Sequence, residues 1–543
     1  MAHSTKLGTT TTTTIAPMHL ETHWGRRIRC KRERHETVDA AFRAAAAVSP
    51  DWVSLVDGPR GYTFNALNRM VDSCAVGLAR RGVGRGDRVV VYLGNCAEAV
   101  ISVLALARLG AILVPAGSRL RRLELEYVMA DSEPIALIYD AALASEVPAR
   151  PLSPVVQLAV GDTPNAGAEN FAELLRESGS PPQCAAHEDD VFAILYTSGT
   201  TGRPKGAMLT HLGAVHSSIH WRECLGLGAG EISMLCIPWS HVAGLCGVVL
   251  PILHAGGRLL MMVTFARRAF LELAERERIT HALMVPAMYG LCLLEPDLEK
   301  FDLSAWRLGV YGSAPMPEPT IQRFASAFPH VTMCNAYGAT ETTSPATIMP
   351  PGQGLTHSDS IGRVVSCGNI RVVDEGGYEV PAGERGEFLI SGPMIASGYW
   401  RNEAATAAAF VDGWWRSGDI GSVDSDGYVR IDDRKKDMIN RGGYKVYPAE
   451  VENVLADREG VIEAAVIGQP DQILGERTVA FVYSTGGVTE ESVRAFCTAR
   501  MADYKVPDRV IVSAEALPRN ANGKIQKDQL RARATLFQVG KSK

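Results

Sequence analysis

The stretch Tyr196-Thr-Ser-Gly-Thr-Thr-Gly-Arg-Pro-Lys-Gly206 follows an apolar run, Phe192 to Tyr196, that has the length and composition of a buried strand. The stretch itself has neither a helical nor a strand period, so the backbone turns there. Its glycines let main-chain N–H groups approach an oxyanion, its hydroxyls add donors and its lysine adds a cation. We therefore predict a phosphate-binding loop. The residues expected to contact phosphate are Thr197, Ser198, Gly199, Thr200, Thr201 and Lys205.

The spacing of this loop differs from the Walker pattern, in which four residues separate a glycine from Gly-Lys-Ser or Gly-Lys-Thr. An ordinary P-loop NTPase is therefore disfavoured. A plain linker is the alternative, because short stretches rich in glycine and serine match many unrelated proteins. The choice between a linker and a ligand loop depends on what the rest of the chain contains.

Composition excludes several classes of protein. The 543 residues include 55 basic and 60 acidic side chains, which argues against a broad nucleic-acid surface. The 11 cysteines show no Cys-x-x-Cys spacing, so neither a zinc site nor a secreted disulfide framework is expected, and a reducing cytoplasm fits best. The most apolar windows, 99–117 and 242–253, contain an arginine or are too short to cross a bilayer.

Residues 1–34 contain six consecutive threonines, Thr9 to Thr14, and then a basic cluster, without an apolar core that could act as a secretory signal. We predict a mostly disordered tail over this segment. A transit peptide is the alternative, but Glu21 and Glu33 and the lack of amphipathic spacing count against it.

After this tail, helix-like and strand-like segments alternate. They include a helix-like run over 38–47, a strand over 88–93 and a buried helix over 97–109. Such alternation is typical of βαβ units and parallel sheets. Short apolar runs over 281–285 and 307–311 each end in a turn that contains proline or glycine. In open α/β sheets, ligands bind beyond strand ends of this kind.

Beyond Arg434 the predicted elements become short. Pro448 stands near the first turn of a helix, and strand-like runs follow over 464–467, 478–483 and 509–512. This pattern predicts a compact α+β domain of about a hundred residues, which is within the usual size range of a domain.

Four further motifs follow the loop: Tyr337-Gly-Ala-Thr-Glu-Thr342, Ser417-Gly-Asp419, Asp433-Arg-Lys-Lys-Asp-Met-Ile439 and Pro518-Arg-Asn-Ala-Asn-Gly-Lys-Ile525. Each alone could be a surface turn or a solvated charge run. Together, and in this order, they resemble the signature blocks of the adenylate-forming superfamily. That superfamily includes acyl-CoA synthetases, the adenylation domains of peptide synthetases and beetle luciferases. The resemblance extends over nearly the whole chain.

The resemblance implies an α/β fold class. A large N-terminal domain over 35–434 would combine doubly wound α/β subdomains with a β-barrel-like part. A small, mobile α+β domain over 435–543 would act as a lid, with ATP, Mg²⁺ and a carboxylic acid bound between the two domains.

The resemblance also assigns a nucleotide site. Tyr337 would stack on adenine, Thr340 would contact the α-phosphate and Glu341 would bind Mg²⁺, a metal that takes one or two carboxylates together with phosphate oxygens. Asp419 and Arg434 would contact the ribose hydroxyls. The residues near the base would be Gly312, Ser313, Ala314, Pro315 and Gly338.

Lys524 would be the catalytic lysine, because a flexible cation can neutralise the negative charge that builds up as a carboxylate approaches the α-phosphate. By resemblance, Lys436 would be the hinge of a domain rotation, and Gly442 and Gly443 would face the CoA channel. The chain departs from the commoner family form at Asn520 and Asn522, where threonines are frequent, which puts the hydrogen bonding of that loop in question.

His241 lies in an apolar stretch, where a satisfied core histidine is the alternative to a functional one. The resemblance favours a position near the acyl pocket. Peptide-synthetase domains for α-amino acids carry an aspartate near the next position, which here is Val242. Burying an unpaired ammonium against valine is costly, so the substrate is predicted to lack an α-amino group. The other pocket residues would be Met288, Tyr289 and Gly338.

The predicted activity is the ATP-dependent conversion of a fatty or aromatic acid to an acyl-adenylate and then to acyl-CoA, with ATP, Mg²⁺ and coenzyme A as cofactors. One alternative is an acyl-AMP ligase that loads a carrier-protein pantetheine, because both acceptors present the same thiol. Another is a non-catalytic nucleotide-binding protein on the same fold. The residues expected to act in catalysis are Thr340, Glu341, His241 and Lys524.

Overall fold

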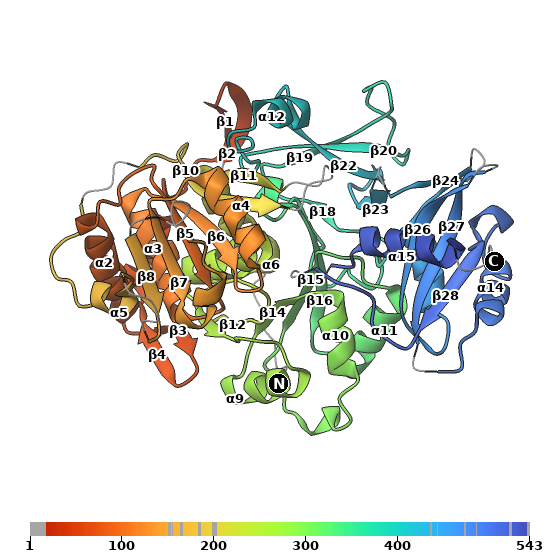
Figure 1. Cartoon of the computed structure of the whole chain (residues 1–543), viewed down its shortest axis with the longest axis horizontal. Coiled ribbons are helices and arrows are strands. Elements are labelled where there is room, and N and C mark those ends of the chain that lie inside the picture. The colour runs from red at the N-terminus through yellow and green to blue at the C-terminus, as the bar shows by residue number, and fades with distance from the viewer. Residues whose placement is uncertain are drawn as a thin grey trace, which may run out of the picture.

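Two large β-sheets with helices between and around them form most of the molecule, and a smaller domain lies at the C-terminal end (Figure 1). The computed structural model describes residues 18–149, 154, 156–162, 167–182, 186–197, 204–434, 437–441, 444–471, 474–484, 486–520 and 524–539.

The first sheet has seven strands, and all neighbouring strands run parallel except β10 and β11, which form an antiparallel pair at one edge. Its central strands are nearly continuous apolar runs, as a sheet covered on both faces requires. In order across the sheet, the strands are β11 (Lys205–Thr210), β10 (Val191–Thr197), β6 (Ile112–Gly117), β5 (Arg88–Leu93), β7 (Ala136–Asp140), β8 (Val156–Val160) and β9 (Glu169–Asn170).

The second sheet has nine strands, with a parallel centre and antiparallel pairs at both edges. In order across the sheet, they are β18 (Arg363–Val364), β17 (Thr347–Ile348), β16 (Thr332–Tyr337), β15 (Leu308–Gly312), β14 (His281–Met284), β12 (Ile232–Leu235), β13 (Arg258–Met261), β3 (Val53–Asp57) and β4 (Arg60–Thr63). The predicted strands at 281–285 and 307–311 are therefore neighbours in one parallel sheet.

Helix α3 (Ala97–Leu109) lies where the two sheets approach each other, since it contacts β5 and β6 of the first sheet and β3 of the second. All of its residues except Glu98 are buried, as expected for a helix that is apolar on every side. Its one buried cation, Arg108, forms ion pairs with Asp39 and Asp72, both at 2.8 Å. The predicted helix over 97–109 has the observed bounds.

Most of the other helices of the larger domain cover the faces of these two sheets, and the last one packs against a third sheet (Figure 1). They are α1 (Val38–Val48), α2 (Phe64–Arg80), α4 (Arg122–Ser132), α5 (Phe171–Leu174), α6 (His211–Leu225), α7 (Val242–Gly244), α8 (Leu250–His254), α9 (Arg267–Glu277), α10 (Pro286–Leu293), α11 (Glu318–Ala327) and α12 (Glu403–Ala409). Among the helices in the described ranges, none combines the length and the apolar character needed to cross a membrane.

The part predicted as barrel-like is a five-stranded antiparallel sheet. In this sheet β22 pairs with β20, β21 and β23, so the motif that contains Asp419 lies on the best-connected strand. The strands are β19 (Asn369–Val373), β20 (Gly386–Ser391), β21 (Phe410–Val411), β22 (Trp414–Val423) and β23 (Val429–Arg434).

The C-terminal domain is an α+β unit, as predicted from the sequence. Helix α13 (Pro448–Ala456) has proline in its first turn and buries Val451 and Leu455. The other elements are β24 (Ile439–Arg441), β25 (Tyr444–Val446), β26 (Val461–Asp471), β27 (Gly475–Ser484), α14 (Glu490–Thr498), β28 (Arg509–Ser513) and α15 (Lys527–Val539).

The N-terminal segment differs from the prediction of a disordered tail over 1–34. Strands β1 (Met18–His23) and β2 (Arg26–Lys31) form an antiparallel hairpin. Arg34 holds it to the large domain, since its guanidinium lies 2.6 Å from a carboxylate oxygen of Glu21 in the hairpin and 2.8 Å from one of Glu188 outside it. The prediction was wrong for 18–34 because these arginine partners are distant in sequence.

Two buried contacts hold the second strand of the hairpin. Ile28 and Cys30 pack against Leu212 of α6. The side chain of Lys31 is fully buried, with its Nζ 2.8 Å from a carboxylate oxygen of Glu223. A buried cation of this kind needs its partner, so Lys31 helps to hold the hairpin on the large domain, whereas Arg27, Arg29 and Arg32 of the same cluster are exposed.

Candidate active site

The carboxyl ends of strands from both large sheets are joined by one buried side chain, Asn95, which follows β5. Its amide nitrogen lies 3.0 Å from the carbonyl oxygen of Ile237 and 2.9 Å from that of Met262. Its side-chain oxygen accepts a hydrogen bond of 2.9 Å from the main-chain N–H of Trp239, whose indole in turn donates to Leu93. Ligand sites in open α/β sheets lie at such carboxyl ends.

The predicted phosphate loop connects β10 to β11, and both of its ends are described. Thr197 and Lys205 are opposite each other in this strand pair. Gly206 permits a close approach, because a Cβ there would lie only 2.7 Å from Ile194. Tyr127 donates a hydrogen bond of 2.7 Å to the carbonyl oxygen of Pro204. The predicted contacts Ser198, Gly199, Thr200 and Thr201 lie outside the described residues.

Tyr337 ends β16 and donates its hydroxyl to Asp419 of β22. Asp419 is buried, and its main-chain N–H donates to Ser417. The two residues predicted to hold adenine and ribose are therefore direct neighbours, although 82 positions separate them in the sequence. Arg434 is opposite Asp419 in the β22–β23 register, which brings the third predicted nucleotide residue to the same place on the sheet.

The turn after β15 runs beside the end of β16. Gly312 is paired with Ala336 there, and a Cβ on Gly312 would lie 2.3 Å from the carbonyl oxygen of Ala336, so only glycine fits. Ser313 has φ +66, in the left-handed region. The segment from Gly312 to Pro315 thus turns at the strand end next to Tyr337, where it was predicted to meet the base.

Glu341 lies in a short 3-10 turn, Thr340–Thr342, that follows Gly338. One of its carboxylate oxygens, Oε1, accepts a hydrogen bond of 2.8 Å from the hydroxyl of Tyr399. Its carbonyl oxygen accepts another of 2.8 Å from the main-chain N–H of Ala396. Within the described part of the chain, no hydrogen bond reaches Oε2. A single half-exposed carboxylate with one oxygen left for a ligand suits Mg²⁺ on a nucleotide, which takes its other ligands from phosphates and water.

Tyr399 was not singled out by the sequence, yet it joins two predicted site residues. Its ring centroid lies 5.1 Å from the Nζ of Lys205, within the range of a cation–π contact. Burial and the neighbouring carboxylate of Glu341 raise the pKa of its hydroxyl, so Tyr399 remains a donor. Only its place in the aromatic pair Tyr399-Trp400, after Gly398, marks it in the sequence.

His241 is the N-cap residue of α7, close to the end of β6, since a Cβ on Gly117 would lie 3.0 Å from the hydroxyl of the preceding Ser240. A π-helical turn, Leu245–Val249, follows, and such turns are frequent at functional sites. Gly244 is required here, because a Cβ would lie 2.2 Å from the carbonyl oxygen of Pro238.

The predicted acyl-pocket residues are not all alike in their surroundings. Val242 and Met288 are half-buried and pack against the same large hydrophobic cluster. Tyr289 is fully buried and donates to the carbonyl oxygens of Ala282 and Val310, at 3.2 and 2.9 Å. Tyr289 is therefore a core residue between the second sheet and its helices, and this placement does not support the predicted role in the pocket.

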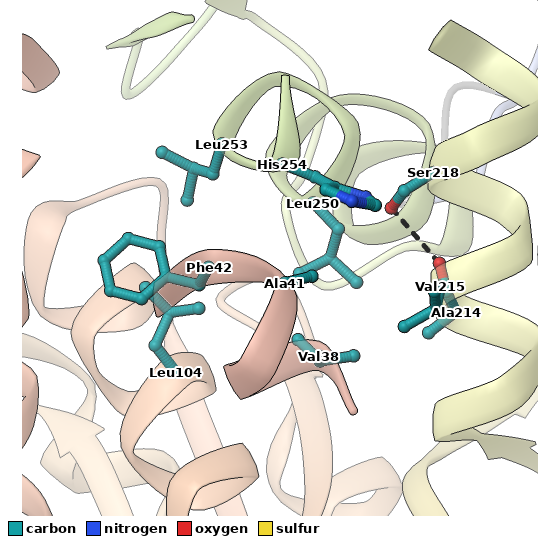
Figure 2. A pocket seen from close by; sticks show the side chains of 10 residues that line it. All are labelled: Val38, Ala41, Phe42, Leu104, Ala214, Val215, Ser218, Leu250, Leu253 and His254. Atoms are coloured by element: carbon teal, nitrogen blue, oxygen red, sulfur yellow. Dashed lines mark hydrogen bonds between the residues drawn. The ribbon is translucent and has the colours of Figure 1, made fainter. Parts of the chain in front are cut away.

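A small cavity lies among α1, α3, α6 and α8 and contains none of the predicted pocket residues (Figure 2). Its lining is apolar apart from Ser218 and His254, and the Ser218 hydroxyl donates to the carbonyl oxygen of Ala214 at 3.1 Å. At about 10 Å³ it has room for roughly one water molecule, so it is a packing defect of the core and not a substrate site.

Lys524 is exposed and lies just before α15. Its main-chain N–H donates to the side-chain oxygen of Asn520, and the N–H of Asn520 donates to the carbonyl oxygen of Lys524, both at 2.9 Å. The asparagine that departs from the commoner family form therefore closes the loop itself. Lys436, Gly442 and Gly443 lie outside the described residues.

Two families match the chain. The AMP-binding enzyme family matches residues 42–400, which is more than half of the sequence. The chain belongs to this AMP-binding enzyme family. Residues 450–524 of the chain match the C-terminal domain of AMP-binding enzymes. The resemblance inferred from the motifs is therefore confirmed.

Several relatives of this AMP-binding enzyme are CoA ligases. Long-chain-fatty-acid–CoA ligase FadD13 of Mycobacterium tuberculosis is 34% identical, with 90% of this chain and 97% of that protein covered. Feruloyl-CoA synthase of an Amycolatopsis species is 35% identical with the same coverage. The crystal structure of the anthranilate CoA ligase AuaEII with anthranoyl-AMP matches with a TM-score of 0.87 at 28% identity, covering 93% of this chain and 98% of that one. The predicted fold class is thereby confirmed.

Proposed function

We propose that this AMP-binding enzyme is an acid–thiol ligase that converts a carboxylic acid to its CoA thioester through an acyl-adenylate. The observation that carries the proposal is the contact of Tyr337 with Asp419 near the Glu341 turn, because it brings an aromatic ring and two carboxylates together where the end of β16 meets β22. The CoA ligase relatives support the same activity.

In the first half-reaction, a carboxylate oxygen of the acid attacks the α-phosphorus of ATP, and the bond to pyrophosphate breaks. Tyr337 stacks on adenine, Asp419 accepts from the ribose hydroxyls and Lys205 faces the phosphates. Thr340 donates to the α-phosphate. Bound Mg²⁺ would be held by Glu341 and would supply positive charge to the phosphate oxygens. Lys524 adds a second, mobile cation at the same transition state.

In the second half-reaction, the thiol of CoA attacks the acyl carbonyl, loses its proton and displaces AMP. Lys524 has to leave the site for this step, and a rotation about Lys436 would remove it and bring Gly442 and Gly443 to the thiol. Among the described residues, Arg385 of the large domain contacts the small domain through the ring of Tyr447, and its guanidinium is largely exposed. A contact of this kind can break during a rotation of the lid.

The acid is proposed to be a fatty or an aromatic acid without an α-amino group. Val242, which follows His241 in the chain, and Met288 are half-buried apolar residues, and no carboxylate occupies the position of Val242. Two of the relatives are named for a long-chain fatty acid and for ferulate. Because those relatives are CoA ligases, they support free CoA as acceptor and give no support to a carrier protein.

The test is a panel of carboxylic acids incubated with ATP, Mg²⁺ and CoA, with pyrophosphate and thioester measured separately. We expect both products with at least one fatty or aromatic acid. Pyrophosphate without thioester would point to another acceptor, and a carrier protein or an amine should then be supplied. Absence of acid-dependent pyrophosphate release across the panel would contradict the proposal.

A further inference from the structure

We propose that Tyr399 is a positioning residue for adenylate formation. Its hydroxyl would fix the orientation of the Glu341 carboxylate, and its ring would hold the ammonium group of Lys205. This inference rests on the proposed function, since it concerns the groups expected to face the metal and the phosphates of ATP.

The backbone around Tyr399 is locked to the strand that leaves the phosphate loop. The N–H of Trp400 donates to the carbonyl oxygen of Gly206 at 2.7 Å, and the N–H of Met208 donates to that of Gly398 at 2.9 Å. Ala207 and Tyr399 form an antiparallel bridge between these contacts. Because these backbone contacts lie on both sides of Tyr399, the main chain at Tyr399 is held in a fixed position relative to the strand that contains Lys205.

The same segment holds the Glu341 turn at two points. Ala396 donates its main-chain N–H to the carbonyl oxygen of Glu341, and Tyr399 donates its hydroxyl to the carboxylate, each at 2.8 Å. A hydrogen bond to an ionised group is shorter and stronger than one between neutral groups. Glu341 therefore has little freedom to rotate, and its second oxygen keeps one direction.

The ring of Tyr399 lies between opposite charges. The Nζ of Lys205 is 5.1 Å from the ring centroid, while Glu341 accepts from the hydroxyl at the ring edge. The other neighbour of the ring is Phe410, at 5.4 Å and tilted by 66°. A phenylalanine at position 399 would retain the contacts with Lys205 and Phe410 and would lose the hydroxyl, with its bond to Glu341 and its contact with the indole of Trp415.

The experiment compares Tyr399→Phe with Trp400→Phe. Trp400 is the adjacent aromatic residue, and its indole donates to the carbonyl oxygen of Asp131 at 3.2 Å instead of to Glu341. Each variant therefore loses one side-chain donor from the same segment. Thermal unfolding should first show that both variants remain folded.

The main readout is binding and does not depend on turnover. The affinity of Mn²⁺ for the enzyme–ATP complex, followed by electron paramagnetic resonance, should fall roughly 10-fold in Tyr399→Phe, as expected for one hydrogen bond to a charged group. Binding of ATP without metal should not change, because Lys205 keeps its ring. The rate of acid-dependent pyrophosphate exchange should fall by a similar factor, with the concentration of Mg²⁺ for half-maximal rate raised.

Equal Mn²⁺ affinity in Tyr399→Phe and the wild type would overturn the inference, as would an equal loss in Trp400→Phe. If the wild type binds Mn²⁺ and ATP but exchanges no pyrophosphate with any acid, the proposed function fails while the binding comparison still tests Tyr399. The two failures are therefore distinguishable.

Discussion

In the proposed mechanism, adenylate formation depends on the positive charge of Lys524. Lys524→Ala should lower the rate of acyl-adenylate formation by at least ~100-fold, the scale for losing a preorganised charge at a transition state. Thioester formation from supplied acyl-adenylate should fall far less, because the lysine is withdrawn in that step. Rapid-quench measurement of each half-reaction would check this.

The matched control for Lys524 is Lys527→Ala, which removes a lysine three positions away that pairs with Glu452 at 2.8 Å. We expect Lys527→Ala to leave both half-reactions near their original rates. An equal loss of both half-reactions in a folded Lys524→Ala protein would contradict its assignment as the adenylation lysine.

Val242 carries a prediction about substrate choice. α-Amino acids should fail to support pyrophosphate exchange, whereas acids of the same size without the amino group should support it, because Val242 offers no carboxylate to a buried ammonium. Val242→Asp should weaken exchange with simple acids by roughly 10-fold or more, since it buries an unpaired charge in the pocket, whereas Val242→Ala should have a smaller effect. Strong exchange with an α-amino acid alone would refute the prediction.

At the scale of elements, the sequence predicts the helices and strands whose type and bounds depend on neighbouring residues in the chain. The helix over 97–109 is apolar at nearly every position and is followed by Gly110, so its type and both bounds follow from the pattern. The hairpin of β1 and β2 was missed because its contacts are remote: Arg34 meets Glu188 and His23 meets Asp189, 154 and 166 positions away. Tyr289 shows the same limit, since an apolar helix residue does not reveal whether it faces core or ligand.

The hairpin gives a prediction that combines mutation and pH. Arg34 lowers the pKa of Glu21 to about 2, mainly through their hydrogen bond. Arg34→Gln should reduce the local stability of 18–31 by about 2 kcal/mol, seen as a roughly 30-fold loss of hydrogen-exchange protection. Arg32→Gln, on an exposed residue of the same segment, should have little effect.

The sign of the pH effect follows from the lowered pKa of Glu21. The stabilisation is complete above the unfolded value of 4.5 and is lost as the pH falls through the folded value near 2. The difference in protection between wild type and Arg34→Gln should therefore be constant from pH 7 to 5 and shrink below pH 4.5. A difference that persists unchanged at pH 2 would show that another contact holds the hairpin.

At the scale of the whole molecule, the candidate site is assembled from segments that the sequence keeps far apart. The family motifs predicted the pairing of Tyr337 with Asp419 only as a shared role in nucleotide binding, and the fold makes them neighbours. The link from Glu341 through Tyr399 to Lys205 could not be predicted, because nothing in the spacing of these residues reports that β11 pairs with the segment around 399. Contacts between segments that are distant in the chain and meet only through strand pairing are thus the hardest to predict from the sequence.

The last prediction concerns motion of the C-terminal domain. If both half-reactions share one site, Lys524 has to be near the α-phosphate in the first and the Gly442 and Gly443 side has to replace it in the second, so a few backbone angles near Lys436 must change. Lys436→Pro would fix φ and remove an N–H donor at that point.

Lys436→Ala is the matched control, because it removes the same side chain and leaves φ free. We expect Lys436→Pro to retain adenylate formation, provided that proline holds the adenylate-forming arrangement, and to lose thioester synthesis by at least ~100-fold, while Lys436→Ala retains both. Single-turnover assays of each half-reaction decide the matter: unchanged rates for both in a folded Lys436→Pro protein would mean that the chain pivots elsewhere or that no rotation separates the two steps.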